Sequence, residues 1–561
     1  MQMLGGRLGV TVWPGQKKQH DSEAAKKKPQ LLLKLPVEEA GRTSILSHMA
    51  NRWVPILIAA ILLAGGMAGG APLDGPRPNV VLIYTDDHDL NEVACYGGKV
   101  LSPHMDGLAR DGMKFTRFYV ASAVCSPSRF NVLTGRYASR SLRFQRNCPP
   151  GSPVNIGWEP GVYGEQNTLA HILQKNGYRT GMVGKWHQGA AGPPPKFGPE
   201  DDPNDSAVKK RLQQSYELLL RSIRETGFDY AASAYHGNVD DGAKGPGKPG
   251  NLPVPLRVHN MEWVTAGALE FIEQNANRPF FLYLAPTLVH GPSPLASLTK
   301  ADPRATSLGF LDKAPQVQPS RQSVLERVKA AGVAPAQAGV TWLDDGVGAV
   351  LDKLAKLGLA ERTLVLLAGD NGNVAKFTCY DGGALMPFLA RWPGKIRPGS
   401  VCDKLTANID LAPTILEVCG IKPPAEAAFD GQNIWPALQG NAAYQRASLM
   451  LEITTERAIV SEDGFKYLAV RYKPAVLEQM AKGVKFNHWC QPMDQSTHSY
   501  NAEKNYPAYW DADQLYDLRQ DPQEQKNLAA QPSQKERLEK MKALLRQYSA
   551  GLPHSFGEFK P

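Results

Sequence analysis

Two pairs of adjacent polar residues have the side chains needed to bind a hard metal ion. Asp86-Asp87 and Asp370-Asn371 each follow a strongly apolar run. Carboxylate and amide oxygens are the ligands that calcium or magnesium prefers, and they suit zinc or copper less well. Acidic residues after a strand also serve as helix caps or solvated turns, so either pair alone is weak evidence. Together the two pairs predict a metal site.

A cysteine lies in a segment with an unusual helix start. The segment 122–135 reads Ser-Ala-Val-Cys-Ser-Pro-Ser-Arg-Phe-Asn-Val-Leu-Thr-Gly. Pro127 suits the first turn of a helix, which places Cys125 at the helix N-terminus and Arg129 one turn along on the same face. The helix dipole and free N–H groups there favour an anion. By itself Cys125 reads as a buried structural thiol, or as a thiolate nucleophile whose pKa this setting lowers.

Alternating apolar runs and amphipathic segments predict the elements that position these side chains. Strands are predicted at 79–84, 179–183, 279–285, 363–368 and 387–391, and helices at 168–176, 261–275 and 340–357. Continuous apolar runs are typical of strands buried on both faces, and their alternation with helices predicts an α/β fold with a large, mostly parallel sheet flanked by helices.

Useful polar groups follow four of the predicted strands. Besides the two metal-ligand pairs, Lys185-Trp-His187 follows the second strand and His290 follows the third. Ligands of parallel sheets bind beyond the carboxyl ends of the strands. We therefore expect one site there, with the Gly/Pro-rich loops at 193–198 and 242–255 near its mouth.

The pattern changes after about residue 438. Short strands at 457–460 and 464–470 and a helix at 533–548 predict a smaller C-terminal α+β domain. The predicted division is therefore 77–438 and 439–555.

The N-terminus resembles a secretory signal peptide. Residues 49–71 have a short basic start, an apolar run and a stretch of small residues, and the apolar run is shorter than the about 20 residues of a membrane anchor. We expect cleavage and export to the periplasm or medium, with membrane contact only during export; a retained anchor is the alternative. Residues 1–48 are interpreted as an extension upstream of a true start at Met49.

Composition, net charge and cysteine spacing argue against a disordered chain, a nucleic-acid-binding protein and a zinc protein. With 42% hydrophobic and 21% charged residues the chain is globular. The net charge of +9 is about half due to residues 1–52, so the remainder argues against a nucleic-acid partner. Besides Cys125 there are six cysteines, whose pairing cannot be read from sequence. The sequence contains no CxxC motif, which argues against a zinc site with cysteine ligands.

The ordered motifs resemble those of the type I (formylglycine-dependent) sulfatases of the wider alkaline phosphatase superfamily. The most specific is Cys125-Ser-Pro-Ser-Arg129 followed by Leu-Thr-Gly135, in which the family oxidises the cysteine to an aldehyde. The resemblance extends from about 77 to 530 and includes segments 78–87, 102–109, 184–187, 369–372, 380–383, 391–394 and 515–528. This chain departs from the family pattern at Asp381, Leu385 and Gly369, where Glu, Arg and Ser or Thr are common.

The resemblance implies a role for each motif residue. Calcium would be held by Asp86, Asp87, Asp370, Asn371 and the modified Cys125; Arg129 would stabilise the hydrated formylglycine; Lys185 and Lys376 would grip sulfate oxygens; His187 would serve the gem-diol and His290 the leaving oxygen. The implied activity is hydrolysis of sulfate monoesters through a formylglycine gem-diol with one Ca²⁺, after maturation by a formylglycine-generating or other sulfatase-maturing enzyme.

Two other functions and the substrate stay open at this stage. The alternatives are a phosphomonoester or phosphonate hydrolase of the same superfamily and a non-catalytic sulfated-glycan-binding protein with Cys125 unoxidised. For the sulfatase, a sulfated carbohydrate is the expected substrate, ahead of aryl and other alkyl sulfates. The aromatic residues Trp158, Trp186, Tyr235 and Trp489 could stack on a sugar, although aromatics more often belong to a core.

Overall fold

The computed structural model describes residues 77–239, 249–493 and 502–561. All of these belong to one compact unit, Ala71–Pro561. The predicted extension 1–48 and signal peptide 49–71 lie outside the described residues. Within the described ranges, none of the helices combines the length and apolar character of a membrane span.

The main sheet has eight strands in the order β11-β2-β10-β9-β1-β6-β4-β5. Their bounds are β1 Asn79–Thr85, β2 Met113–Phe115, β4 Arg179–Lys185, β5 Tyr230–Tyr235, β6 Phe280–Ala285, β9 Thr363–Gly369, β10 Phe388–Arg391 and β11 Ser400–Cys402. Every neighbouring pair is parallel except the two made by β10. The predicted, mostly parallel sheet is confirmed.

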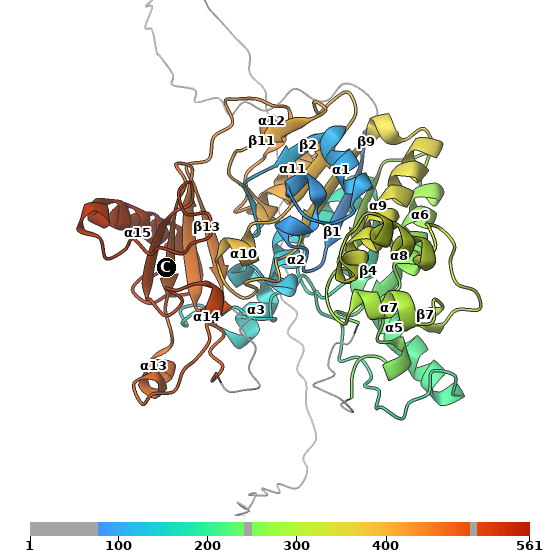
Figure 1. Cartoon of the computed structure of the whole chain (residues 1–561), viewed down its shortest axis with the longest axis horizontal. Coiled ribbons are helices and arrows are strands. Elements are labelled where there is room, and N and C mark those ends of the chain that lie inside the picture. Colours follow the sequence, from blue (N-terminus) through green and yellow to red (C-terminus); the bar gives the residue numbers. More distant parts are fainter. Residues whose placement is uncertain (1–76, 240–248, 494–501) are drawn as a thin grey trace, which may run out of the picture. The chain divides into compact units, whose positions relative to one another are not determined.

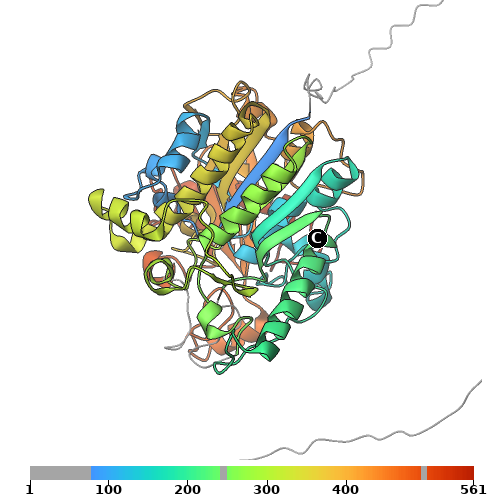
Figure 2. The same ribbon diagram turned by 90° about the vertical axis from the view of Figure 1, so that its right-hand side faces the viewer.

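Helices flank this sheet. Those before the C-terminal part are α1 Pro103–Arg110, α2 Cys125–Thr134, α3 Leu142–Asn147, α4 Leu169–Lys175, α5 Ser206–Arg224, α6 Met261–Gln274, α7 Pro294–Lys300, α8 Arg321–Ala330, α9 Ala338–Lys356, α10 Asp381–Ala384, α11 Leu411–Val418 and α12 Trp435–Leu438. The long helices α6 and α9 lie side by side next to the blue β1 (Figure 2). Because β1, β6 and β9 are buried along their whole length, both faces of the sheet are covered.

The central pair of strands brings the two acidic segments together. β1 and β9 run parallel in register, with Thr85 opposite Gly369 at their carboxyl ends. The backbone N–H of Asp370 donates to the carbonyl of Thr85 at 2.9 Å, and that of Asp86 donates to the carbonyl of Leu288 at 3.0 Å. Asp86 and Asp370 are therefore neighbours because the strands that precede them are neighbours.

A second sheet of four antiparallel strands follows in the C-terminal part. It contains β13 Ser448–Ile453, β14 Glu456–Ser461, β15 Phe465–Val470 and β16 Asp513–Asp517, and it packs against α15 Lys535–Ser549. Figure 1 shows these elements as an orange-to-red group beside α10. The expected smaller C-terminal α+β part is confirmed, whereas the boundary at 438 stays a prediction. The shorter elements are β3 Phe118–Tyr119 with β12 Thr406–Ala407, β7 Ala305–Thr306 with β8 Gly309–Phe310, α13 Pro474–Met480 and α14 Ala502–Asn505.

Candidate active site

Four of the five predicted metal ligands form one buried cluster at the ends of β1 and β9. Asp86, Asp370 and Asn371 have no exposed surface, and Asp87 is 6% exposed. One ligand atom from each of Asp86, Asp87, Cys125 and Asp370 can be chosen so that all lie within 4.8 Å of one another. The structure thus assembles the predicted set, and the metal-binding role of each residue stays a prediction.

The side chain of Asn371 is the observation that fits a cation. Its Nδ2 donates to Asp87 Oδ1 at 2.7 Å, while its Oδ1 is buried and accepts no hydrogen bond from the described residues. A buried carbonyl oxygen without a donor is costly. A hard cation among these carboxylates would satisfy it, and the all-oxygen protein donors suit calcium or magnesium.

Three cations of the chain balance the three carboxylates. Lys185 Nζ lies 2.7 Å from Asp86 and Arg129 Nη2 lies 2.7 Å from Asp370, and Lys376 Nζ lies 2.6 Å from Asp87. Because these charges offset one another, a bound divalent ion would leave the cluster with a net positive charge. Such a site favours an anionic group such as a sulfate ester.

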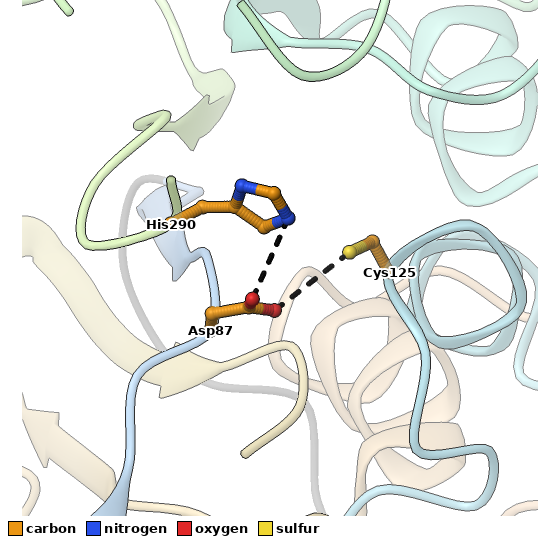
Figure 3. Close-up of side chains that lie close together, drawn as sticks. All are labelled: Asp87, Cys125 and His290. Carbon is orange, nitrogen blue, oxygen red and sulfur yellow. Dashed lines mark hydrogen bonds and ion pairs between the residues drawn. The ribbon is translucent and has the colours of Figure 1, made fainter. Parts of the chain in front are cut away.

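Cys125 is the first residue of α2 and faces this cluster (Figure 3). Its Sγ lies 3.9 Å from Asp87 Oδ1 and 3.3 Å from Lys376 Nζ, and the residue is fully buried. Gly135, with φ +65°, ends the helix in the left-handed conformation that a side chain would strain.

The thiol of Cys125 behaves differently from one sequence-based expectation. Burial raises its pKa to about 12, although the charges of Lys185 and Lys376 pull the other way. The thiol pKa therefore lies above its usual value and not below it as expected, because desolvation outweighs the charges of the two lysines. An unmodified thiolate nucleophile is disfavoured.

Arg129 lies on the same face of α2, one turn beyond Cys125, as predicted from its spacing. Its guanidinium contacts Asp370 at 2.7 Å and lies 3.6 Å from Asp86. The residue is completely buried, and its Nη1 lies within 3.4 Å of the Tyr283 hydroxyl. Arg129 therefore sits between the helix that carries Cys125 and the metal-ligand cluster.

Lys185 ends β4 and is completely buried. Its Nζ contacts both carboxylate oxygens of Asp86 and also donates to Asn238 Oδ1. Burial opposes the lysine charge, but Asp86, Cys125 and Asp370 together outweigh it, so the pKa of Lys185 rises above its usual value. The amine therefore remains a cation.

The two histidines differ in their surroundings. Burial, together with the charges of Lys185 and Arg129, holds the pKa of His187 well below its usual value, so its ring is neutral at neutral pH. His290 is partly exposed; its Nε2 lies 3.4 Å from Asp87 Oδ2 (Figure 3), and its Nδ1 lies 2.7 Å from the carbonyl of Gly291. The neutral ring of His187 can accept a proton.

The C-terminal sheet supports the segment that carries Lys376. Glu456 on β14 accepts a hydrogen bond from the backbone N–H of Cys379 at 2.6 Å and also contacts His488. The Phe377 ring stacks on Trp489 with a centroid distance of 3.7 Å. Glu456 and Trp489 thus hold the segment 376–380 from the C-terminal part of the chain.

A buried charge cluster continues this support. Lys466 Nζ on β15 donates to Asp381 Oδ1 at 2.8 Å and lies 2.8 Å from Glu524 Oε1, and Glu524 Oε2 accepts from the backbone N–H of Asp381 at 2.7 Å. All three residues are largely buried. Burial raises the pKa of Glu524 to about 8, against the opposing charge of Lys466.

A cleft of about 850 Å³ leads to the cluster. Trp158, His187 and Trp489 line it, and Trp158 stacks on the His187 ring at 5.5 Å while the Lys376 amine lies 5.6 Å from the Trp158 ring. Pro193, Pro194 and Asn251 from the two predicted mouth loops also line it, although residues 242–248 of the second loop lie outside the described residues.

Only part of the aromatic expectation holds. Trp158 and Trp489 line the cleft, but Trp186 and Tyr235 are each 1% exposed and belong to the core. Trp186 does not line the cleft, and its indole N–H donates to the carbonyl of Gly189. Sequence reasoning also missed Asn238 and Arg143, since neither lies in a recognisable motif and only the fold brings them to the cleft.

Comparison with known proteins identifies the family. A model of the sulfatase family matches residues 78–421. This chain is a sulfatase. Arylsulfatase A from Homo sapiens is 31% identical over 422 residues, which cover 69% of this sulfatase and 72% of the relative. The match supports assignment as a hydrolase of sulfuric esters, in the alkaline phosphatase-like superfamily.

Carbohydrate sulfatases are also among the relatives of this sulfatase. N-acetylgalactosamine-6-O-sulfatase from Bacteroides thetaiotaomicron is 25% identical over 556 residues, covering 86% of this chain and 96% of the relative. A solved structure from the same organism, described under the metabolism of multiple glycosaminoglycans, has a TM-score of 0.59 at 22% identity and covers 84% of this sulfatase and 99% of that chain. At this identity the structural likeness shows the fold alone.

Proposed function

We propose that this sulfatase removes sulfate from a sulfated carbohydrate, with residue 125 matured to formylglycine and one bound Ca²⁺. The observation that carries the proposal is the position of Cys125 at the start of α2, facing Asp87 and Lys376 and close to the metal-ligand cluster. An ordinary structural thiol has no need of three buried cations and three buried carboxylates around it.

Two groups would be supplied to the site. Calcium, held by Asp86, Asp87, Asp370, Asn371 and residue 125, would supply positive charge to the sulfate and to the nucleophile. Formylglycine would supply a hydrated aldehyde, in which one hydroxyl attacks sulfur and the other allows sulfate to leave. A serine at this place would remain as a stable sulfate ester.

Five side chains of the protein would bind the sulfate, stabilise charge and transfer protons. Lys185 and Lys376 grip the sulfate oxygens, and Arg129, fixed by Asp370, stabilises charge beside residue 125. His290 gives a proton to the departing oxygen, aided by Asp87, and the neutral His187 takes one from residue 125.

The cleft supports a carbohydrate substrate. Its flat faces, Trp158 and Trp489, suit the apolar face of a sugar ring. Relatives include an N-acetylgalactosamine-6-O-sulfatase and an ulvan-active sulfatase. One solved structure of this fold is described in complex with its substrate, D-glucosamine-2-N,6-O-disulfate.

The proposal includes a maturing partner and export. Because Cys125 is fully buried, a formylglycine-generating or other sulfatase-maturing enzyme needs an earlier, more open state of the chain. The signal-peptide pattern at 49–71 supports export to the periplasm or medium. Fractionation of the producing cells, with N-terminal sequencing of the product, tests this part.

The test of the activity is sulfate release by protein co-expressed with a maturing enzyme and loaded with Ca²⁺. Peptide mass spectrometry should find the aldehyde at residue 125, and sulfated sugars should release inorganic sulfate. Cys125→Ala should abolish release, whereas Cys95→Ala, a half-buried cysteine outside the cluster, should retain it. Faster turnover of an aryl phosphate or phosphonate than of the aryl sulfate would instead favour a phosphoesterase, and no sulfate release from any ester would refute the proposal.

A further inference from the structure

The cleft wall contains an arginine that forms no ion pair with the residues that the structure describes. Arg143 on α3 lines the cleft together with Trp158 and His187. Its side chain lies along two glycines: a Cβ built at Gly161 would be 3.2 Å from Arg143 Nη1, and one at Gly189 would be 3.5 Å from its Nε. Gly189 is two residues beyond His187. The Arg143 guanidinium therefore lies beside the short segment that follows this histidine.

Two arginines that precede Arg143 on the same stretch form ion pairs. Arg136 contacts Glu165 at 3.1 Å and Arg140 contacts Asp430 at 2.8 Å. Among the residues that the structure describes, Arg143 makes neither a hydrogen bond nor an ion pair. Burial lowers its pKa below the usual value, although the charge of Glu159 opposes this. A half-buried guanidinium without a partner is unfavourable unless a ligand supplies the anion.

The remainder of the cleft is suited to an anionic, ring-containing ligand. None of the described residues that line it is Asp or Glu, and Trp158 and Trp489 offer flat faces between polar groups. Its volume of about 850 Å³ is near the upper end of pockets for drug-sized ligands. The cleft therefore has room beyond one sulfated ring.

We propose that Arg143 binds a second anionic group, a sulfate or a carboxylate, on the sulfated glycan whose scissile ester lies at the catalytic cluster. The inference rests on the proposed function and makes the substrate class polyanionic. The planar guanidinium offers parallel N–H donors to either anion, so a sulfate and a carboxylate would be bound by the same pair of hydrogen bonds. The ring between the two anions would lie against the cleft aromatics.

The test compares substrate pairs that share the scissile ester and differ in the second anion. One pair is a disulfated and a monosulfated glucosamine; the other is a sulfated hexosamine–glucuronate disaccharide and the same disaccharide with its carboxylate reduced to an alcohol. For the wild type, kcat/KM should be higher for the more anionic member of at least one pair, and the responding pair distinguishes sulfate from carboxylate.

Variants then assign the preference to Arg143. Arg143→Ala should lower the ratio of kcat/KM values within the responding pair by about 10- to 100-fold, mainly through KM, because a charge-assisted contact is lost. Arg143→Lys should restore only part of the ratio, since lysine lacks the two parallel N–H donors of the guanidinium. Arg146→Ala, which removes an exposed arginine from the same helix, should leave the ratio as in the wild type.

A binding measurement separates this inference from the proposed function. Affinities of Cys125→Ala and Cys125→Ala/Arg143→Ala for the same glucosamine and disaccharide pairs are compared by calorimetry at low salt. If no ester releases sulfate but Arg143→Ala still weakens binding of the more anionic member, the proposed function fails and the anion site stands. An equal ratio in Arg143→Ala and Arg146→Ala, with equal affinities of the two binding variants, overturns the inference.

Discussion

Replacing Lys466 with methionine tests whether the C-terminal sheet holds the segment that carries Lys376. The substitution removes the cation that contacts Asp381 and Glu524, each at 2.8 Å, while keeping most of the side-chain volume. Removing one partner of a buried ion pair typically costs about 3–5 kcal/mol, because the other charge stays buried. We expect a loss in this range.

The loss should depend on pH in a defined direction. Burial raises the pKa of Glu524 to about 8, so below that pH its carboxyl is protonated in the folded protein and only Asp381 loses its partner. At pH values above about 8, Glu524 also ionises in the wild type and is paired with Lys466. The destabilisation by Lys466→Met should therefore grow from about 3 kcal/mol near pH 6 to about 4 kcal/mol near pH 9.

Thermal unfolding at the two pH values, followed by fluorescence, measures this effect. Lys526→Met, at an exposed lysine of the same C-terminal part, is the matched control and should change stability by less than about 0.5 kcal/mol. Adding Asp381→Asn to Lys466→Met should recover part of the loss near pH 6. If Lys466→Met unfolds at the same temperature as Lys526→Met at both pH values, the charge cluster does not stabilise this junction.

Two further predictions concern metal binding and acid stability. Calcium at 1,000 times its Kd should stabilise the protein by about 4 kcal/mol, a chelator should remove this increment, and Asp370→Asn should abolish it whereas the exposed-site change Asp352→Asn should not. An increment that survives Asp370→Asn would exclude the cluster as the calcium site. Burial lowers the pKa of His259, which contacts Thr287 and the Pro292 carbonyl, to about 4. Since the unfolded chain takes that proton near pH 6.5, stability should fall as pH drops from 7 to 5, by about 2 kcal/mol from this group. His259→Gln should flatten this part of the stability–pH curve, and an unchanged curve would contradict the reasoning.

The strands that position the site could be predicted because their sequences are extreme. The apolar runs at 79–84 and 363–368 became the central strands, and the polar residues after them met at one edge as parallel pairing requires. β5, whose sequence is Tyr-Ala-Ala-Ser-Ala-Tyr, was not predicted, because alanine and serine carry little strand preference and the strand lies at the sheet edge.

Other features depend on contacts that local sequence does not encode. The run at 387–391 was predicted as a strand, yet nothing in it indicated that β10 would be antiparallel to β9. The pKa of the Cys125 thiol rises because the surrounding fold excludes water, which a helix-terminus argument does not include. Which described residues lie close enough to pair with Arg143 likewise depends on the fold.

The metal-ligand pairs and the walls of the cleft belong to different kinds of structural element. Asp86-Asp87 and Asp370-Asn371 extend two neighbouring strands at the centre of the sheet, where a one-residue slip would turn every side chain to the other face. Much of the wall comes from connections, such as the segments that carry Trp158 and Trp489, and connections tolerate changes in length and sequence. Substrate choice and bond cleavage are consequently separable in this architecture. Exchanging the wall segments between relatives would change the substrate preference and leave the residues of the reaction centre unchanged.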